Sequence, residues 1–202
     1  MIRVGVLASG SGSNFQALVE RLNGPGSPAR VELLLCNVKG AKAIDRAQTL
    51  KVPTKVLEHT AFNGREAFDE AAVAILKEHR IDLVCLAGYM RLVTPAFLKH
   101  FAGKVINVHP ALLPSFPGLH GARQALERGV KITGCTVHFV DEGTDTGPII
   151  AQVAVPVLPS DDEAALSARI QVEEHRVFAS VVLAIAENRV QLRGRDVLVR
   201  PS

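Results

Sequence analysis

The chain has 202 residues, 48% of them hydrophobic and 21% charged, which is typical of an ordinary globular protein with one substantial core. A net charge of +3 from scattered basic residues, with one Tyr and no Trp, suits an anionic small molecule and excludes a nucleic-acid surface built on stacking aromatics. Because no segment is long enough to span a bilayer, no secretory signal begins the chain, and the three cysteines form no C-x-x-C, we expect a cytoplasmic protein with free thiols and no membrane partner.

Strand and helix patterns alternate through the first half of the chain. Apolar runs, typical of strands buried on both faces, lie at 4–8, 31–36 and 83–87. A short strand is expected at 54–57, and the apolar pair at 105–106 begins another strand that ends at 109. Helical spacing of apolar residues lies between them, at 14–22, 44–50 and 65–79. This order predicts an α/β fold with a mostly parallel twisted sheet flanked by helices.

The second half of the chain has a different pattern. A proline-rich loop after residue 109 leads to a short helix at 122–128, and strand-like runs follow at 133–140 and 149–157. The connection between these two runs is short, which favours an antiparallel pair. Ser160 or Asp161 is then expected to cap a long helix that runs to about Asn188. No linker divides the chain, so we expect a single domain over 1–202, with 192–202 as a variable tail.

Two polar side chains end the apolar run at 105–109. Asn107 and His109 are two residues apart, so a strand places them on the same face, at its carboxyl end, where open α/β sheets bind ligands. An amide and an imidazole together suit a reaction that creates negative charge on oxygen and moves a proton. Spacing alone favours the plainer interpretation, a polar strand end that turns into a loop.

The Gly- and Ser-rich turn at 9–14 begins like a dinucleotide fingerprint but departs from it. Phe15 stands where the third small residue belongs, and the second strand ends in Asn37 rather than an acid. What remains is a strand, a tight turn and a helix amino terminus, where backbone N–H groups and the helix dipole bind a phosphate. We therefore favour phosphate binding by Gly12, Ser13 and Asn14 over a simple helix cap.

Several other polar residues have two interpretations. Asp145, in a polar loop, either lies near His109 and raises the pKa of its imidazole, or bonds its own backbone in a turn. For His120 and His138 we prefer loop packing and a satisfied core histidine. Gln171 and Glu174 share a helix face that the pattern alone predicts to be solvated. The remaining histidines have no partner at metal-ligand spacing, so we expect no metal.

Four motifs occur together in the order and spacing of one family. They are Ser9-Gly10-Ser11-Gly12-Ser13-Asn14, Ala87-Gly88-Tyr89-Met90-Arg91, Asn107-Val108-His109-Pro110-Ala111-Leu112-Leu113-Pro114 and Gly143-Thr144-Asp145-Thr146-Gly147-Pro148. In this, the chain resembles the phosphoribosylglycinamide formyltransferases, folate-dependent enzymes of purine biosynthesis, up to about Gln191. The resemblance implies a Rossmann-like formyltransferase fold and transfer of the formyl group of 10-formyltetrahydrofolate to the amine of phosphoribosylglycinamide.

The resemblance also implies roles for particular residues, and it reverses the preference for plain structural roles at Asn107, His109, Asp145 and Glu174. Asn107 and protonated His109 would stabilise the oxyanion, with Asp145 holding the imidazole charged. The residues implied for the phosphoribosylglycinamide substrate are Gly12, Ser13, Asn14, Pro110, Gln171 and Glu174. Those implied for the folate co-substrate are Arg65, Met90, Arg91, Leu92, Val93, Asn107, Asp141 and Asp145.

Four alternatives share part of this pattern. A 10-formyltetrahydrofolate hydrolase has the same three polar residues and typically an extra amino-terminal domain, whereas a methionyl-tRNA formyltransferase has an added carboxyl-terminal RNA-binding domain. We expect neither addition here. A nucleotide-binding oxidoreductase is disfavoured by Phe15 and Asn37, and a non-catalytic sensor would bind phosphoribosyl compounds without turnover. We expect small-molecule substrates only and a monomer or homodimer.

Overall fold

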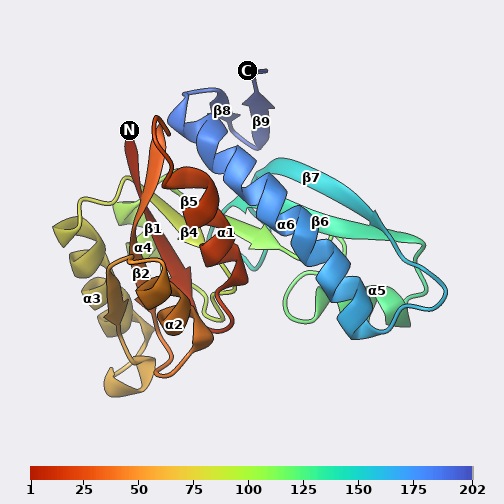
Figure 1. Ribbon diagram of the computed structural model, residues 1–202, viewed down its shortest axis with the longest axis horizontal. Helices are drawn as coiled ribbons and strands as arrows, with labels where there is room; N and C mark the ends of the chain where they lie inside the picture. The colour runs from red at the N-terminus through yellow and green to blue at the C-terminus, as the bar shows by residue number, and fades with distance from the viewer. Residues whose placement is uncertain (202) are drawn as a thin grey trace. The chain divides into compact units, whose positions relative to one another are not determined.

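The computed structural model describes residues 1–201, in which strands and helices alternate as predicted (Figure 1). The strands are β1 (Ile2–Ala8), β2 (Ala29–Cys36), β3 (Thr54–Val56), β4 (Leu83–Leu86), β5 (Val105–His109), β6 (Ile132–Phe139), β7 (Ile149–Pro156), β8 (Val190–Arg193) and β9 (Asp196–Val199). The helices are α1 (Ser13–Leu22), α2 (Lys42–Thr49), the 3-10 helix η1 (His59–Ala61), α3 (Arg65–Glu78), α4 (Pro95–His100), α5 (Gly121–Glu127) and α6 (Glu163–Ala186). The long helical and strand patterns are therefore confirmed, whereas η1, α4, β8 and β9 were not predicted.

The main sheet has seven strands in the order β3-β2-β1-β4-β5-β6-β7. Strand β1 pairs in parallel with β2 and β4, and β2 pairs in parallel with β3. Strand β7 is antiparallel to β6, as the short connection predicted. The α/β class with a mostly parallel sheet and an antiparallel pair is confirmed. Contacts divide the chain into two compact units, Met1–Ile106 and the residues from Asn107 onward. The prediction of a single domain over 1–202 stays a prediction.

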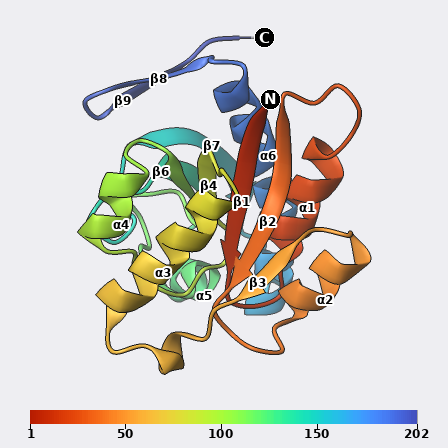
Figure 2. The same ribbon diagram turned by 90° about the vertical axis from the view of Figure 1, so that its left-hand side faces the viewer.

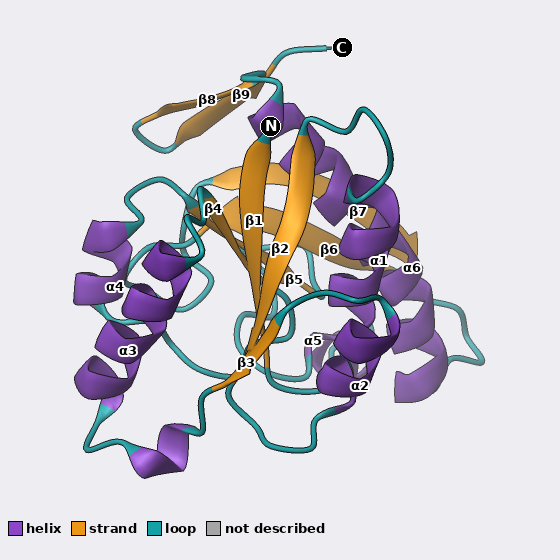
Figure 3. Ribbon diagram, turned by 60° about the vertical axis from the view of Figure 1, so that its left-hand side comes forward, coloured by secondary structure: helices purple, strands orange, loops and turns teal. Residues whose placement is uncertain are grey.

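In the first unit, helices cover both faces of the parallel strands. Helices α1 and α2 lie on one face of β1 and β2, and α3 and α4 lie on the other (Figures 2 and 3). The apolar stripes of these helices supply the core, and Phe15, Phe68 and Phe97 are fully buried. Burying each such side chain contributes about 1.5–3 kcal/mol. The carboxyl ends of β1 and β2 are thereby held next to the turn at 9–12.

In the second unit, the long helix α6 lies along β6 and β7 (Figure 1). Its N-cap is Asp162, whose side chain accepts a hydrogen bond of 2.7 Å from the Ala165 amide, so the predicted caps Ser160 and Asp161 are wrong. Asp161 does not cap the helix because its two carboxylate oxygens bind the Arg169 guanidinium, each at 2.7 Å.

The segment after α6 forms a small sheet of its own from β8 and β9, where we expected a variable tail. The turn of this hairpin is Gly194-Arg195, and Arg195 Nη2 donates a 2.7 Å hydrogen bond to the Thr146 carbonyl. The tail is therefore in contact with the loop that carries Asp145.

Cys36, Cys85 and Cys135 are buried and free, as predicted. None of the helices described within residues 1–201 has the length and apolar character that a bilayer crossing requires.

Candidate active site

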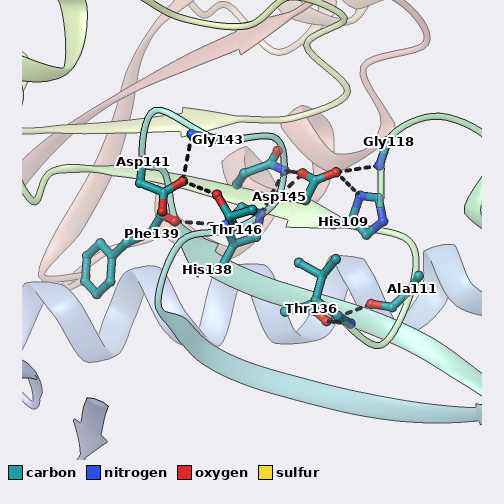
Figure 4. A network of polar contacts seen from close by, with 12 residues as sticks. His109, Ala111, Gly118, Thr136, His138, Phe139, Asp141, Gly143, Asp145 and Thr146 are labelled. Atoms are coloured by element: carbon teal, nitrogen blue, oxygen red, sulfur yellow. Dashed lines mark hydrogen bonds and ion pairs between the residues drawn. The ribbon is translucent and has the colours of Figure 1, made fainter. Parts of the chain in front are cut away.

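Asn107 and His109 lie two residues apart on β5, so their side chains share one face of the strand. The loop between β6 and β7 brings Asp145 to the His109 ring (Figure 4). The Asp145 Oδ2 atom lies 3.2 Å from His109 Nδ1, and Asp145 Oδ1 accepts a 3.4 Å hydrogen bond from Asn107 Nδ2. His109 is buried, whereas Asn107 and Asp145 are partly exposed. The second unit therefore brings together the amide, the imidazole and the carboxylate that the sequence singled out.

The Asp145 carboxylate is surrounded by donors. Its Oδ2 atom accepts a 2.8 Å hydrogen bond from the Gly118 amide, and its Oδ1 atom lies 3.6 Å from His138 Nε2. Burial raises the pKa of Asp145, but the hydrogen bonds from His138 and Gly118 and the charges of His109 and His138 lower it more. The pKa of Asp145 therefore lies below its ordinary value, and this group is an anion at neutral pH.

Both ring nitrogens of His109 face oxygen acceptors. Nδ1 faces Asp145, and Nε2 lies 2.7 Å from the Phe116 carbonyl oxygen. Only the imidazolium donates to both, since a neutral ring has one N–H and one lone pair. Burial nevertheless lowers the pKa of His109, and the His138 charge lowers it further. The Asp145 charge and the hydrogen bond to the Phe116 carbonyl act in the other direction and raise it. The net direction is downward, so the expected raised pKa is wrong, because burial outweighs the carboxylate.

His138 belongs to the same network, although the sequence favoured a plain core histidine. It is buried as expected, and its Nδ1 atom lies 2.8 Å from the Phe139 carbonyl oxygen. Its Nε2 atom lies 3.2 Å from Asn107 Nδ2 and 3.6 Å from Asp145 Oδ1, so the ring contacts both the amide and the carboxylate. His138 therefore orients the Asn107 amide. The sequence did offer one signal for this role: His138 lies two residues from Thr136, and therefore on the same face of β6.

The turn that the sequence predicts to bind phosphate, residues 9–14 and hereafter the phosphate turn, joins β1 to α1. Gly12 is the N-cap of α1 at φ 72°, and Ser13 and Asn14 are the first two residues of the helix. A side chain at Gly12 would collide with α2, because its Cβ would lie 2.6 Å from Ala43 Cα. No side chain caps the helix, and its first turn contains no acidic residue. The predicted phosphate binding depends on such a helix terminus, in which neither a side-chain cap nor an acid competes with an anion.

The remaining residues predicted for the phosphoribosyl substrate lie in the second unit. Pro110 follows β5 and is half-buried, and Gln171 is exposed on α6. Glu174 is buried, with 7% of its surface exposed. The solvated helix face that the pattern alone predicted is therefore wrong at Glu174, because this part of α6 packs against β6 and β7.

The predicted folate residues lie in both units. In the first unit, Arg65 begins α3, Met90 and Leu92 are exposed, Val93 is buried, and Arg91 lies over the Phe68 ring at 4.6 Å. In the second unit, Asp141 lies in the same loop as Asp145 and accepts hydrogen bonds from the Gly143 amide at 3.1 Å and from Thr146 Oγ1 at 2.6 Å. His120 is exposed, and its Nδ1 atom lies 3.6 Å from Glu163 Oε1.

Sequence reasoning missed two side chains that hold the segment from Met90 to Val93. The Met90 amide donates a 2.8 Å hydrogen bond to Ser9 Oγ, and the Thr94 amide donates one of 2.6 Å to Asp69 Oδ2. Asp69 is 2% exposed on a helix whose pattern suggested only apolar burial, so its position gave no separate signal.

Among residues 1–201, no three His, Cys, Asp or Glu side chains are arranged to bind a metal ion.

The family model described as "Formyl transferase" matches residues 2–182. The phosphoribosylglycinamide formyltransferase of Bacillus subtilis is 43% identical over 182 residues, which cover 90% of this chain and 93% of that protein. The human trifunctional purine biosynthetic protein adenosine-3 is 45% identical over 190 residues, which are 94% of this chain but 19% of that protein. The chain thus spans less than a fifth of the trifunctional relatives that it matches.

Solved structures agree with these matches over the whole chain. Glycinamide ribonucleotide transformylase 1 from Symbiobacterium toebii superimposes with a TM-score of 0.97 at 46% identity, covering 100% of this chain and 95% of that one. The phosphoribosylglycinamide formyltransferase from Anaplasma phagocytophilum gives a TM-score of 0.93 at 39% identity, covering 99% and 94%. At 39% and 46% identity, these proteins resemble this chain in sequence as well as in fold.

Proposed function

Because this chain belongs to the formyl transferase family, we propose that it transfers the formyl group of 10-formyltetrahydrofolate to the amine of 5-phosphoribosylglycinamide. The products are 5-phosphoribosyl-N-formylglycinamide and tetrahydrofolate, in de novo purine biosynthesis. The observation that carries the proposal is the contact of the Asp145 carboxylate with His109, beside the Asn107 amide. The similarity to the Bacillus subtilis enzyme, over 93% of its length, supports the choice of substrates.

The proposed reaction forms one C–N bond and breaks another. The glycinamide amine attacks the formyl carbon, and the electron pair of the C=O bond moves onto the formyl oxygen. When this pair returns, the bond to the N10 atom of the folate breaks. The attacking amine loses one proton and the departing N10 gains one. Such a path needs a donor for the oxyanion and a group that moves a proton.

His109 is the proposed proton-transfer group. Because burial lowers the pKa of His109, the imidazolium forms at a lower pH than it does on a free imidazole. The Asp145 carboxylate stabilises the imidazolium when it forms, because the opposite charge lies 3.2 Å from Nδ1. Nε2 is held by the Phe116 carbonyl in this structure, so the ring has to exchange that hydrogen bond for one to the reacting groups.

Asn107 is the proposed donor to the oxyanion. Its two amide protons face His138 Nε2 at 3.2 Å and Asp145 Oδ1 at 3.4 Å. We assign the oxyanion contact to the proton on the longer, weaker bond, while the bond to His138 keeps the amide in place. One such donor contributes on the order of 3–4 kcal/mol to the transition state.

The proposed binding residues follow from the same motifs. Gly12, Ser13 and Asn14 take the phosphate, because their turn offers a helix terminus without a side-chain cap or an acid. Glu174, with Pro110 and Gln171, is proposed for the ribosyl part. The proposed folate residues are Arg65, Met90, Arg91, Leu92, Val93, Asn107, Asp141 and Asp145.

The test supplies 10-formyltetrahydrofolate with and without phosphoribosylglycinamide and follows tetrahydrofolate release. We expect release that requires the amine, together with stoichiometric formylated product. Release at the same rate without the amine would identify a hydrolase instead. Absence of release in both cases would refute enzymatic turnover and leave a binding protein.

A further inference from the structure

Helix α2 contacts the turn at 9–12 through two hydrogen bonds to its carbonyl groups. The Ala43 amide donates to the Gly10 carbonyl at 3.1 Å, and Arg46 Nε donates to the Ser11 carbonyl at 2.8 Å. The Gly12 Cα atom lies against Ala43, with no room for a Cβ. Both carbonyl oxygens, which would repel an anion, are therefore engaged by donors of α2.

Arg46 is a cation whose partners are neutral. Besides the Ser11 carbonyl, its guanidinium donates from Nη1 to Gln16 Oε1, and Gln16 Nε2 in turn donates to Glu20 Oε1 at 2.7 Å. The Gln16 amide thus stands between Arg46 and the nearest bonded carboxylate. Within residues 1–201 no carboxylate forms an ion pair with Arg46, although the residue is partly buried.

The positive charge of Arg46 adds to that of the α1 terminus. The first turn of α1 has no acidic residue, so the partial positive charge of the helix dipole is not compensated there. A dianionic phosphate would compensate both charges. The bond from Arg46 to Ser11 also fixes the backbone just before Gly12, and therefore the direction of the amides that follow.

We propose that Arg46 is a positioning residue of the phosphate turn, which holds the Ser11 carbonyl toward α2 and makes the chain select the phosphorylated amine over its dephosphorylated form. The identity of the substrate rests on the proposed function, whereas the binding of phosphate does not. Arg46 acts through the turn and through its charge, and contact with the substrate is not required.

The experiment compares Arg46→Met and Arg46→Lys with the wild-type chain, using phosphoribosylglycinamide and the same amine without its phosphate. For Arg46→Met we expect KM for the phosphorylated amine to rise about tenfold and kcat to stay within about twofold, since the reacting groups are untouched. The kcat/KM for the dephosphorylated amine should not change. Arg46→Lys keeps the charge but loses the planar guanidinium, so we expect an intermediate KM.

The matched control is Arg30→Met, which also removes one arginine charge. Arg30 lies near the amino end of β2, whereas the phosphate turn lies near its carboxyl end, so both KM values should stay unchanged. Equal losses with both amines, or an unchanged KM in Arg46→Met, would overturn the proposal. If the wild-type chain transfers no formyl group, the proposed function fails. Calorimetric titration with inorganic phosphate then tests the role of Arg46 without any turnover assay. Weaker phosphate binding by Arg46→Met than by Arg30→Met then supports the role of Arg46, and equal binding refutes it.

Discussion

His109 Nδ1 lies 3.2 Å from Asp145 Oδ2, yet the pKa of His109 lies below its ordinary value. The ring is 3% exposed, and this burial disfavours the imidazolium more than the carboxylate and the Phe116 carbonyl favour it. The carboxylate therefore offsets part of a burial cost. In the proposed reaction, the carboxylate thereby makes the imidazolium easier to form than burial alone would allow.

Replacing Asp145 with Asn should lower the pKa of His109 further. The substitution removes the charge that raises this pKa and leaves the burial that lowers it. If the imidazolium is the active form, turnover at pH 7 falls, and the high-pH side of the kcat profile shifts to lower pH. NMR titration of the imidazole and a pH–rate profile measure the two effects. Glu142→Gln, an exposed carboxylate of the same loop, is the control, and an unmoved profile in Asp145→Asn would contradict the proposed role.

Replacing His109 with Ala should separate catalysis from binding. Turnover should fall on the order of 10²–10⁴-fold, as for loss of a general acid–base group. Calorimetric affinity for phosphoribosylglycinamide should stay within a few fold, because His109 is not among the residues proposed to bind it, which are Gly12, Ser13, Asn14, Pro110, Gln171 and Glu174. His120→Ala serves as the control, since this histidine is exposed. Turnover within threefold of wild type would remove His109 from the mechanism.

The period of the apolar residues was sufficient to predict the sheet and the shared face of Asn107 and His109. Strand geometry is local, so the alternation of side chains follows from the sequence. The contact of Asp145 is not local: its backbone has φ 54°, and the Gly118 amide, 27 residues away, holds the carboxylate. The resemblance to a family supplied that contact, and the spacing of residues did not.

The pKa of His109 and the burial of Glu174 depend on packing, which a pattern does not quantify. The sequence pattern of α6 predicts that Glu174 is exposed to solvent, yet the residue is buried because α6 packs on β6 and β7. The β8–β9 hairpin was missed for another reason, because two four-residue strands with exposed faces have little hydrophobic periodicity. Gly194, at its turn, was the one local signal.

Replacing Gly12 with Ala should damage the phosphate turn and the stability of the first unit together. The residue has φ 72°, and an added Cβ would lie 2.6 Å from Ala43 Cα, so both the backbone and α2 have to shift. We expect a loss of about 1–3 kcal/mol in unfolding free energy and a higher KM for the phosphorylated amine. Gly26→Ala shares the positive φ, at 74°, but has open space, and it should change stability without changing KM. Equal KM values in the two variants would show that contact with α2 is irrelevant to binding.

Replacing Asp161 with Asn should reduce stability in a way that depends on pH. Hydrogen bonds from Arg169 and the Leu158 amide lower the pKa of Asp161 to about 2. A carboxyl with a depressed pKa in the folded state stabilises the fold above its ordinary pKa of about 3.9, and this contribution is lost as the pH falls toward 2. The variant should therefore have a lower Tm than wild type at pH 5–7, and the difference should shrink steadily as the pH falls through about 2. Asp162→Asn is the matched control, because Asn caps a helix as well as Asp and should leave Tm nearly unchanged. A constant Tm difference from pH 7 to pH 2 would show that the ion pair with Arg169 is not its source.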